Sequence, residues 1–85
     1  MPGEAPDFVE LDAAGDVVLP AEAIARLLGA PLDAVLADLR AGIVYSVVER
    51  GEGEDAGRLR LTLRRRGTSI SLVVDAATGQ VLGAA

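Results

Sequence analysis

The pattern of apolar and polar positions predicts a β-hairpin near the start of the chain. Residues 8–12 alternate between apolar and polar side chains, and an apolar run at residues 17–19 follows a turn-rich segment. Short runs of this kind on either side of a turn are typical of two paired strands. Residues 1–7 contain two prolines and are expected to form a disordered lead-in, so the predicted domain spans residues 8–85.

Two helices are predicted after the hairpin. In residues 20–29 the apolar side chains of Ile24, Leu27 and Leu28 repeat at helical spacing, and the final glycine ends the stretch. Residues 31–42 begin with a proline that suits a first helical turn and end with another glycine. Their apolar stripe is the longest in the chain and consists of Leu32, Val35, Leu36 and Leu39.

The remaining pattern predicts strands. Residues 43–50 are rich in β-branched side chains and are apolar at both parities, whereas residues 58–64 and 69–74 alternate regularly. A short apolar run at residues 81–82 is expected to form at most a stub strand. The predicted class is α+β, with two helices on one face of an antiparallel sheet of four to five strands, in the order β-β-α-α-β-β-β.

Composition narrows the possible chemistry. The 85 residues include 13 acidic and 8 basic side chains, all of the basic ones arginine, and no histidine or cysteine. Thiolate or imidazole metal sites and histidine- or cysteine-dependent catalysis are therefore excluded. We expect no enzymatic activity, no cofactor and no metal. The apolar runs are too short to span a membrane, and the acidic start of the chain is unlike a signal peptide, so a cytoplasmic location is expected.

The helix pair at residues 21–42 suggests one alternative function. Together with the hairpin at residues 43–66 it has the order of a winged-helix DNA-binding protein. However, the second helix carries Asp33 and Asp38 where a recognition helix needs donors for base edges and phosphates. An ordinary helical hairpin covering a sheet is the favoured interpretation, and nucleic acid is not an expected partner.

Charged residues surround a glycine-rich loop at residues 51–57. The candidate binding residues in and around this loop are Glu49, Arg50, Glu54, Asp55, Arg58, Arg60 and Arg64. Because opposite charges on adjacent strands attract, these carboxylates are expected to pair with the arginines and order the loop. Whether the loop binds a ligand or is only a solvated turn stays open.

The arginines of residues 58–64 are predicted to share one sheet face with Arg66. One interpretation is a surface for an anion or an acidic protein partner. The other is a solvated face whose arginines meet Glu10 and Asp12 of the N-terminal hairpin.

Self-association is also predicted. If residues 43, 45 and 47 face the helices, then Val44 and Val48 lie on the opposite face of the sheet, which Val73 shares. Three valines ringed by polar residues resemble a contact site, so a homodimer through that face or a sheet edge is expected. The alternative is a monomer in which another segment covers this strand.

Residues 49–63 read E-R-G-E-G-E-D-A-G-R-L-R-L-T-L. In this stretch the chain resembles a family of short bacterial proteins known only as a domain of unknown function. The resemblance extends to Phe8, to the Leu28-Gly29 helix end and to the junction at residues 40–43, and covers most of residues 8–82. It implies a single small α+β domain and no particular activity. The sequence therefore predicts a non-enzymatic binding or protein-interaction module with an unknown protein partner.

Overall fold

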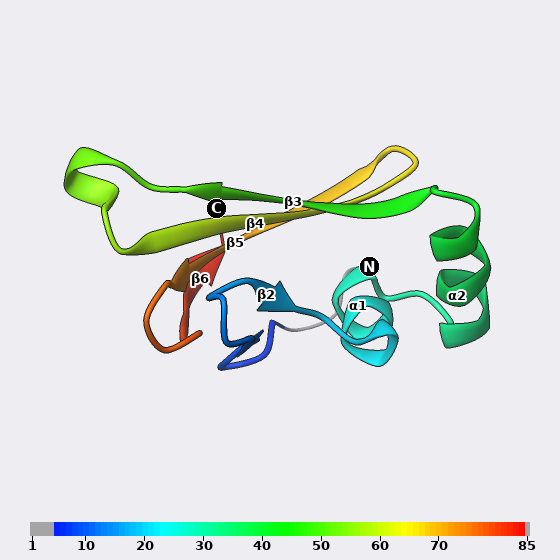
Figure 1. Ribbon diagram of the computed structural model, residues 1–85. Helices are drawn as coiled ribbons and strands as arrows, with labels where there is room; N and C mark the ends of the chain where they lie inside the picture. Colours follow the sequence, from blue (N-terminus) through cyan, green and yellow to red (C-terminus); the bar gives the residue numbers. More distant parts are fainter. Residues whose placement is uncertain (1–4, 85) are drawn as a thin grey trace.

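The computed structural model describes residues 5–84. Two short strands, two helices and four longer strands follow one another along the chain (Figure 1). Their bounds are β1 (Glu10–Leu11), β2 (Val17–Val18), α1 (Ala21–Leu28), α2 (Leu32–Arg40), β3 (Val44–Arg50), β4 (Arg58–Arg65), β5 (Thr68–Asp75) and β6 (Val81–Ala84), with a single 3₁₀ turn, η1 (Gly53–Asp55), between β3 and β4.

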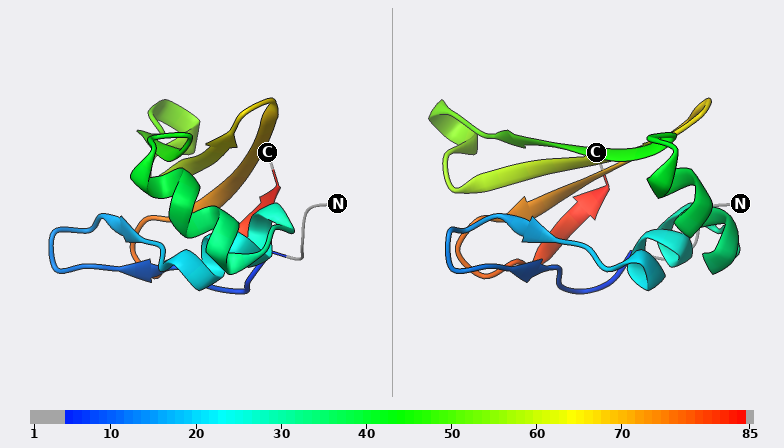
Figure 2. Two further views of the ribbon diagram at one scale, coloured as in Figure 1. Left: turned by 90° about the vertical axis from the view of Figure 1, so that its right-hand side faces the viewer. Right: turned by 45° about the vertical axis from the view of Figure 1, so that its right-hand side comes forward.

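The predicted α+β class is confirmed, with two differences in the strands. The main sheet has four antiparallel strands in the order β3-β4-β5-β6, and β1 and β2 form a separate two-stranded sheet. The predicted stub at the end of the chain is a full strand, because β6 pairs with β5. The helices and the β1–β2 hairpin lie together on one side of the twisted main sheet (Figure 2).

Backbone contacts tie the start of the described chain to the turn before β6. The N–H of Val9 donates to the carbonyl of Gly79 at 2.8 Å, and the N–H of Val81 donates to the carbonyl of Asp7 at 2.8 Å. Residues 1–4 of the predicted lead-in lie outside the described residues. Asp7, which was assigned to that lead-in, is thus already bound to the main sheet.

The core lies between the main sheet and the layer of helices and hairpin. Leu59, Leu61 and Leu63 of β4 are each 1% exposed and face this layer. From the opposite side α1 contributes Ile24, Leu27 and Leu28, the three residues whose spacing predicted the helix. The side chains that alternate in β4 and those that repeat at helical spacing in α1 therefore pack together in one core.

Helix α2 packs differently from its sequence pattern. Of the predicted apolar stripe only Val35 is fully buried, whereas Leu32, Leu36 and Leu39 are each more than a third exposed. The helix lies at the end of the sheet, beside the start of β3, so it presents a narrow contact to the core (Figures 1 and 2). Three leucines of the predicted apolar stripe are therefore only partly buried.

Candidate functional site

Strand β3 is an edge of the main sheet, and within residues 5–84 no strand pairs with its outer side. It pairs with β4 on one side only. Six of its seven side chains are exposed, and three of these are large and apolar: Tyr45 at 51%, Val47 at 41% and Val48 at 44%. A long apolar edge strand is a template for pairing with another strand, and soluble proteins usually protect such edges.

The backbone groups that point away from β4 follow from the ladder. The N–H of Gly51 donates to the carbonyl of Arg58 at 2.9 Å, so these two opposed residues form a hydrogen-bonded pair. Hydrogen-bonded pairs alternate along an antiparallel ladder, which directs the N–H and C=O of residues 45, 47 and 49 toward β4. The corresponding groups of Ser46, Val48 and Arg50 therefore point out of the open edge.

The opposite edge of the sheet, β6, is protected in ways that β3 is not. Strand β6 has four residues, one of them a glycine, and its pairing with β5 is interrupted between Val73 and Val74. Strand β3 is longer and contains neither proline nor glycine, and its register with β4 is continuous. Short and irregular edges resist further pairing, so β3 is the open edge of this sheet.

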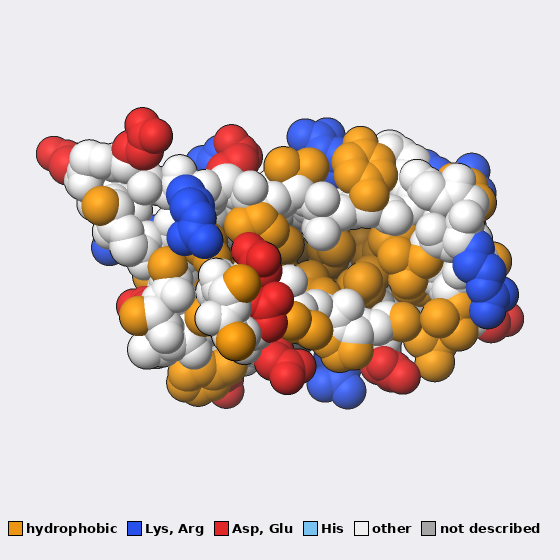
Figure 3. Space-filling model, viewed as in Figure 1, with side chains coloured by type: hydrophobic (Ala, Val, Ile, Leu, Met, Phe, Trp, Pro, Cys, Tyr) orange, Lys and Arg blue, Asp and Glu red, His pale blue; other side chains and the backbone are white. Residues whose placement is uncertain are grey.

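An apolar groove lies directly beneath the open edge. It has a volume of about 320 Å³ and is seen in Figure 3 as a hollow lined with hydrophobic side chains between β3 and the β2–α1 segment. The residues that line it are Val17, Leu19, Ile24, Leu39, Val44, Tyr45, Ser46, Leu61 and Leu63. Its contacts with β3 are confined to the first half of that strand.

The predicted self-association patch is not one surface. Val44 is 3% exposed and belongs to the core, and Val48 lies on the same helix-facing side of the sheet, opposite Leu61. Val73 lies on the other side, in one row with Arg60. The parity assigned to residues 43–48 was therefore wrong, because the side chains that this segment directs to the open face are Tyr45 and Val47.

The hairpin register explains this reversal. Strand β3 is apolar at both parities, so its own pattern does not determine which side faces the core. Pairing of Gly51 with Arg58 places Ser46 opposite Leu63 and Val48 opposite Leu61. A register count from the loop to the buried leucines of β4 was the signal that could have found the correct face.

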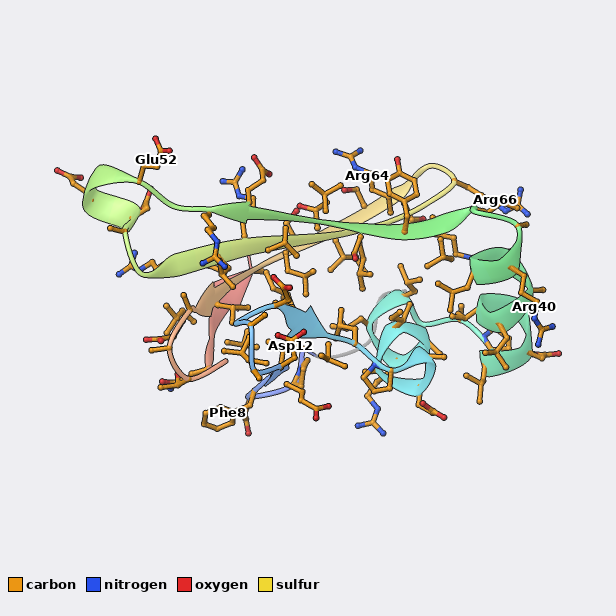
Figure 4. The ribbon with its side chains drawn as sticks, viewed as in Figure 1. Phe8, Asp12, Arg40, Glu52, Arg64 and Arg66 are labelled. Carbon is orange, nitrogen blue, oxygen red and sulfur yellow. The ribbon has the colours of Figure 1, made fainter. Side chains whose placement is uncertain are left out.

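Five of the seven predicted binding residues line a charged cleft at the far end of the β3–β4 hairpin. The cleft has a volume of about 410 Å³, and the five are Glu49, Arg50, Asp55, Arg58 and Arg60. Glu54 does not line it, and Arg64 lies toward the other end of β4, away from Glu52 at the loop (Figure 4). The structure thus brings most of the predicted set together and leaves out those two residues.

Of the ion pairs predicted around this loop, one is present among the described residues. Nη1 of Arg58 lies 3.8 Å from Oδ1 of Asp55, and both side chains are more than half exposed. Such a pair contributes at most about 1 kcal/mol. The loop takes its shape mainly from backbone hydrogen bonds, in which Asp55 donates to Glu52 and Ala56 donates to Gly53.

The predicted arginine face is smaller than expected. Arg58, Arg60 and Arg64 lie on the open side of β4, but Arg65 and Arg66 turn toward α2. Nε of Arg65 donates to Oδ2 of the buried Asp38 at 2.8 Å, and Nη2 of Arg66 lies 3.8 Å from the other carboxylate oxygen.

The predicted ion pairs between these arginines and Glu10 or Asp12 do not form among the described residues. Glu10 and Asp12 belong to the separate hairpin, where Asp12 accepts hydrogen bonds from the N–H groups of Ala14 and Asp16. Strand β1 does not pair with the main sheet, so the alternation argument that linked the two sets fails.

One carboxyl at the hairpin end has a perturbed pKa. The backbone N–H groups of Ala77 and Thr78 donate to Oδ1 of Asp75, and these bonds hold the pKa of its carboxyl below its usual value. Asp75 therefore serves to shape the β5–β6 turn.

The described residues offer neither a metal-binding cluster nor a membrane-spanning helix. Within residues 5–84 there is no group of three or more acidic, histidine or cysteine side chains that could hold a metal ion. None of the helices in that part of the chain has the length and apolar character needed to cross a bilayer.

Comparison with known proteins identifies the family. A search of curated proteins gives no match, and a search of solved structures gives none either. A family model described as a family of unknown function, DUF6522, matches residues 7–85. A family of unknown function is what the resemblance at residues 49–63 predicted. The match extends over the hairpin, both helices and the main sheet. The chain belongs to the DUF6522 family of unknown function.

Proposed function

We propose that this chain is a non-enzymatic protein-interaction domain that accepts an extended strand of a protein partner along β3. The observation that carries the proposal is the open edge itself, seven residues long, with its outward backbone groups unpaired by the sheet and its side chains exposed. Strand addition at such an edge gives affinity through main-chain hydrogen bonds, and pockets for alternate side chains give specificity.

The groove supports the same function. An added strand that pairs with β3 directs every second side chain to the helix-facing side of the sheet. The groove opens there, next to Ser46, and seven of the nine residues that line it are aliphatic. A strand with a small or medium apolar residue at that position would bury it against Leu39 and Leu61.

The surfaces needed for the alternative functions are less suitable. A recognition helix in the position of α2 would present Leu32, Leu36 and Leu39 to DNA, together with the carboxylate of Asp33, and these groups do not neutralise phosphates. The charged cleft holds acids and arginines that are largely exposed, with no histidine or cysteine to act as nucleophile or general base. Interaction through the β3 edge therefore accounts best for the exposed groups.

The test uses a synthetic peptide with the sequence of residues 43–51, acetylated and amidated, added in large excess to the ¹⁵N-labelled chain at low concentration. We expect the amide signals of Ser46, Val48 and Arg50 to shift and their hydrogen exchange to slow. The amides of Tyr45 and Val47 already face β4 and serve as internal controls. Shifts confined to the charged cleft, or none at millimolar peptide, would contradict the proposal.

Two variants test the location of binding. Ser46→Pro removes an outward donor without touching the β4 ladder, a position where edge strands tolerate proline, and should abolish peptide binding. Val48→Asp leaves the backbone intact and places a charge on the open edge, opposite Leu61, so it should also weaken peptide binding and guards against a folding defect in the first variant. Arg26→Ala, which removes an exposed arginine of α1, is the matched control and should bind the peptide like the unmodified chain.

A further inference from the structure

We infer that the strand accepted at the β3 edge is β3 of a second copy of this chain, arranged antiparallel about a two-fold axis at Val47. This inference rests on the proposed function and names its partner. The two main sheets then join into one continuous sheet, and each chain offers the same surface to the other. Such isologous pairing is the commonest form of homodimer.

The backbone fixes a small number of possible registers. Only Val44, Ser46, Val48 and Arg50 have backbone groups directed outward, and a two-fold axis perpendicular to the sheet gives the longest pairings when Ser46, Val47 or Val48 lies at its centre. Centring on Val47 uses the whole strand, with Ser46 opposite Val48 of the second copy. It forms about eight backbone hydrogen bonds, and the other two registers shorten the paired region.

The side chains on the helix-facing side complement themselves in this register. The groove lies against the first half of β3, at Val44 and Ser46, whereas the exposed Val48 lies in the second half. Antiparallel pairing brings the second half of one strand against the first half of the other. Val48 of each copy therefore covers the mouth of the other copy's groove, and both apolar surfaces leave water together.

The charges on the open face agree with the same register. Within one chain Tyr45 lies opposite Arg64 and Glu49 lies opposite Arg60. Pairing about Val47 places Glu49 of the second copy beside Tyr45. The row of side chains across the interface is then Arg64 and Tyr45 of one copy, followed by Glu49 and Arg60 of the other. On the helix-facing side, Arg50 falls opposite Val44 at the rim, where its guanidinium can remain in solvent. The interface is small compared with an obligate dimer, so we expect a dissociation constant in the micromolar range.

Single-cysteine variants test the pairing and its register, because the natural chain has no cysteine. In the proposed dimer the two Val47 positions form a non-hydrogen-bonded pair with Cα atoms about 4.5 Å apart, within the range that a disulfide spans. The Val47→Cys chain should therefore oxidise to a covalent dimer. Tyr45→Cys is the matched control on the same face, and its two thiols would lie about 13 Å apart along the strands. We expect the control to cross-link on the order of a hundred times more slowly, since pairing concentrates only the first pair of thiols.

The outcomes separate this inference from the proposed function. Fast cross-linking of Val47→Cys, with a dimer mass for the unmodified chain in sedimentation, supports the inference. Fast cross-linking of Ser46→Cys or Val48→Cys instead overturns the register. A species of 8.7 kDa at high concentration, with equal slow cross-linking at residues 45 and 47, overturns self-pairing. If the peptide of residues 43–51 still protects the edge amides in that last case, the strand-accepting function stands and only the second copy is ruled out.

Discussion

Arg65 and Asp38 join the end of β4 to helix α2, with Nε of the arginine donating to Oδ2 of the carboxylate at 2.8 Å. The aspartate side chain is 12% exposed and the arginine side chain 27% exposed, so the pair is shielded from much of the solvent. This contact holds α2 beside the start of β3. It thereby sets one wall of the apolar groove, because Leu39 follows Asp38 in the same helix.

Removing the carboxylate should loosen the helix. Asp38→Ala leaves a partly buried guanidinium without its partner, and we expect the free energy of unfolding to fall by about 2–3 kcal/mol. Asp33→Ala removes an exposed carboxylate from the first turn of the same helix and should cost about 0.5 kcal/mol. Urea unfolding followed by circular dichroism measures both. Equal losses in the two variants would show that the contact with Arg65 has no special role.

The packing of α2 predicts different responses from neighbouring apolar residues. Val35 is 0% exposed, so Val35→Ala should lower the free energy of unfolding by about 2 kcal/mol through lost burial and a small cavity. Leu36 is 37% exposed, and Leu36→Gln should lower it by less, about 1 kcal/mol. Thermal or urea unfolding of both variants checks this. A large loss from Leu36→Gln would place that residue in the core, as the sequence pattern predicts.

Gly51 is required where β3 ends. A Cβ atom added there would overlap the backbone oxygen of Asp55, so the backbone of the loop would have to move. Gly51→Ala should therefore destabilise the chain by about 2 kcal/mol or more and weaken order in the loop. Gly67→Ala is the control, because a Cβ at Gly67 meets no atom within 4 Å. Similar melting temperatures for the two variants would argue against the tight loop seen here.

The turn before β6 should contribute stability that depends on pH. Two backbone N–H groups hold the pKa of Asp75 below its ordinary value of 3.8, so the folded state favours the ionised carboxylate. That contribution is present above pH 3.8 and is lost as the pH falls through the lower folded value. Asp75→Ala should thus be less stable than the natural chain near neutral pH, with the difference shrinking in acid. An NMR titration of Asp75 with a midpoint above 3.8 would contradict this.

Local signals predicted most of the secondary structure, and long-range packing decided what they could not. Gly29 ends α1 in the left-handed conformation, with φ 65°, as its position after an apolar helical repeat predicts. The β1–β2 hairpin was predicted, but its separation from the main sheet was not, and neither was the backbone hydrogen bond of Val9 with Gly79, which joins segments far apart in the sequence. A local sequence pattern does not predict contacts between segments that are far apart in the sequence.

The candidate site shows the same division. The charges around residues 51–57 were visible in the sequence, and most of them meet in one cleft. The open β3 edge was assigned the wrong face, because its side chains are apolar at both parities. The leucine stripe of α2 has the spacing of a core helix, yet the helix lies at the end of the sheet, and three of its leucines are each more than a third exposed. The position of an element relative to its neighbours decides burial, and periodicity alone does not.

Amide hydrogen exchange along β3, measured at low and at high chain concentration, tests the central claim most directly. The account predicts that the amides of Ser46, Val48 and Arg50 exchange fast in the dilute chain and become protected as the concentration rises. The amides of Tyr45, Val47 and Glu49 should be protected at both concentrations, since they face β4. Outward amides that exchange equally fast at every concentration, even with the peptide of residues 43–51 present, would contradict a strand-accepting edge.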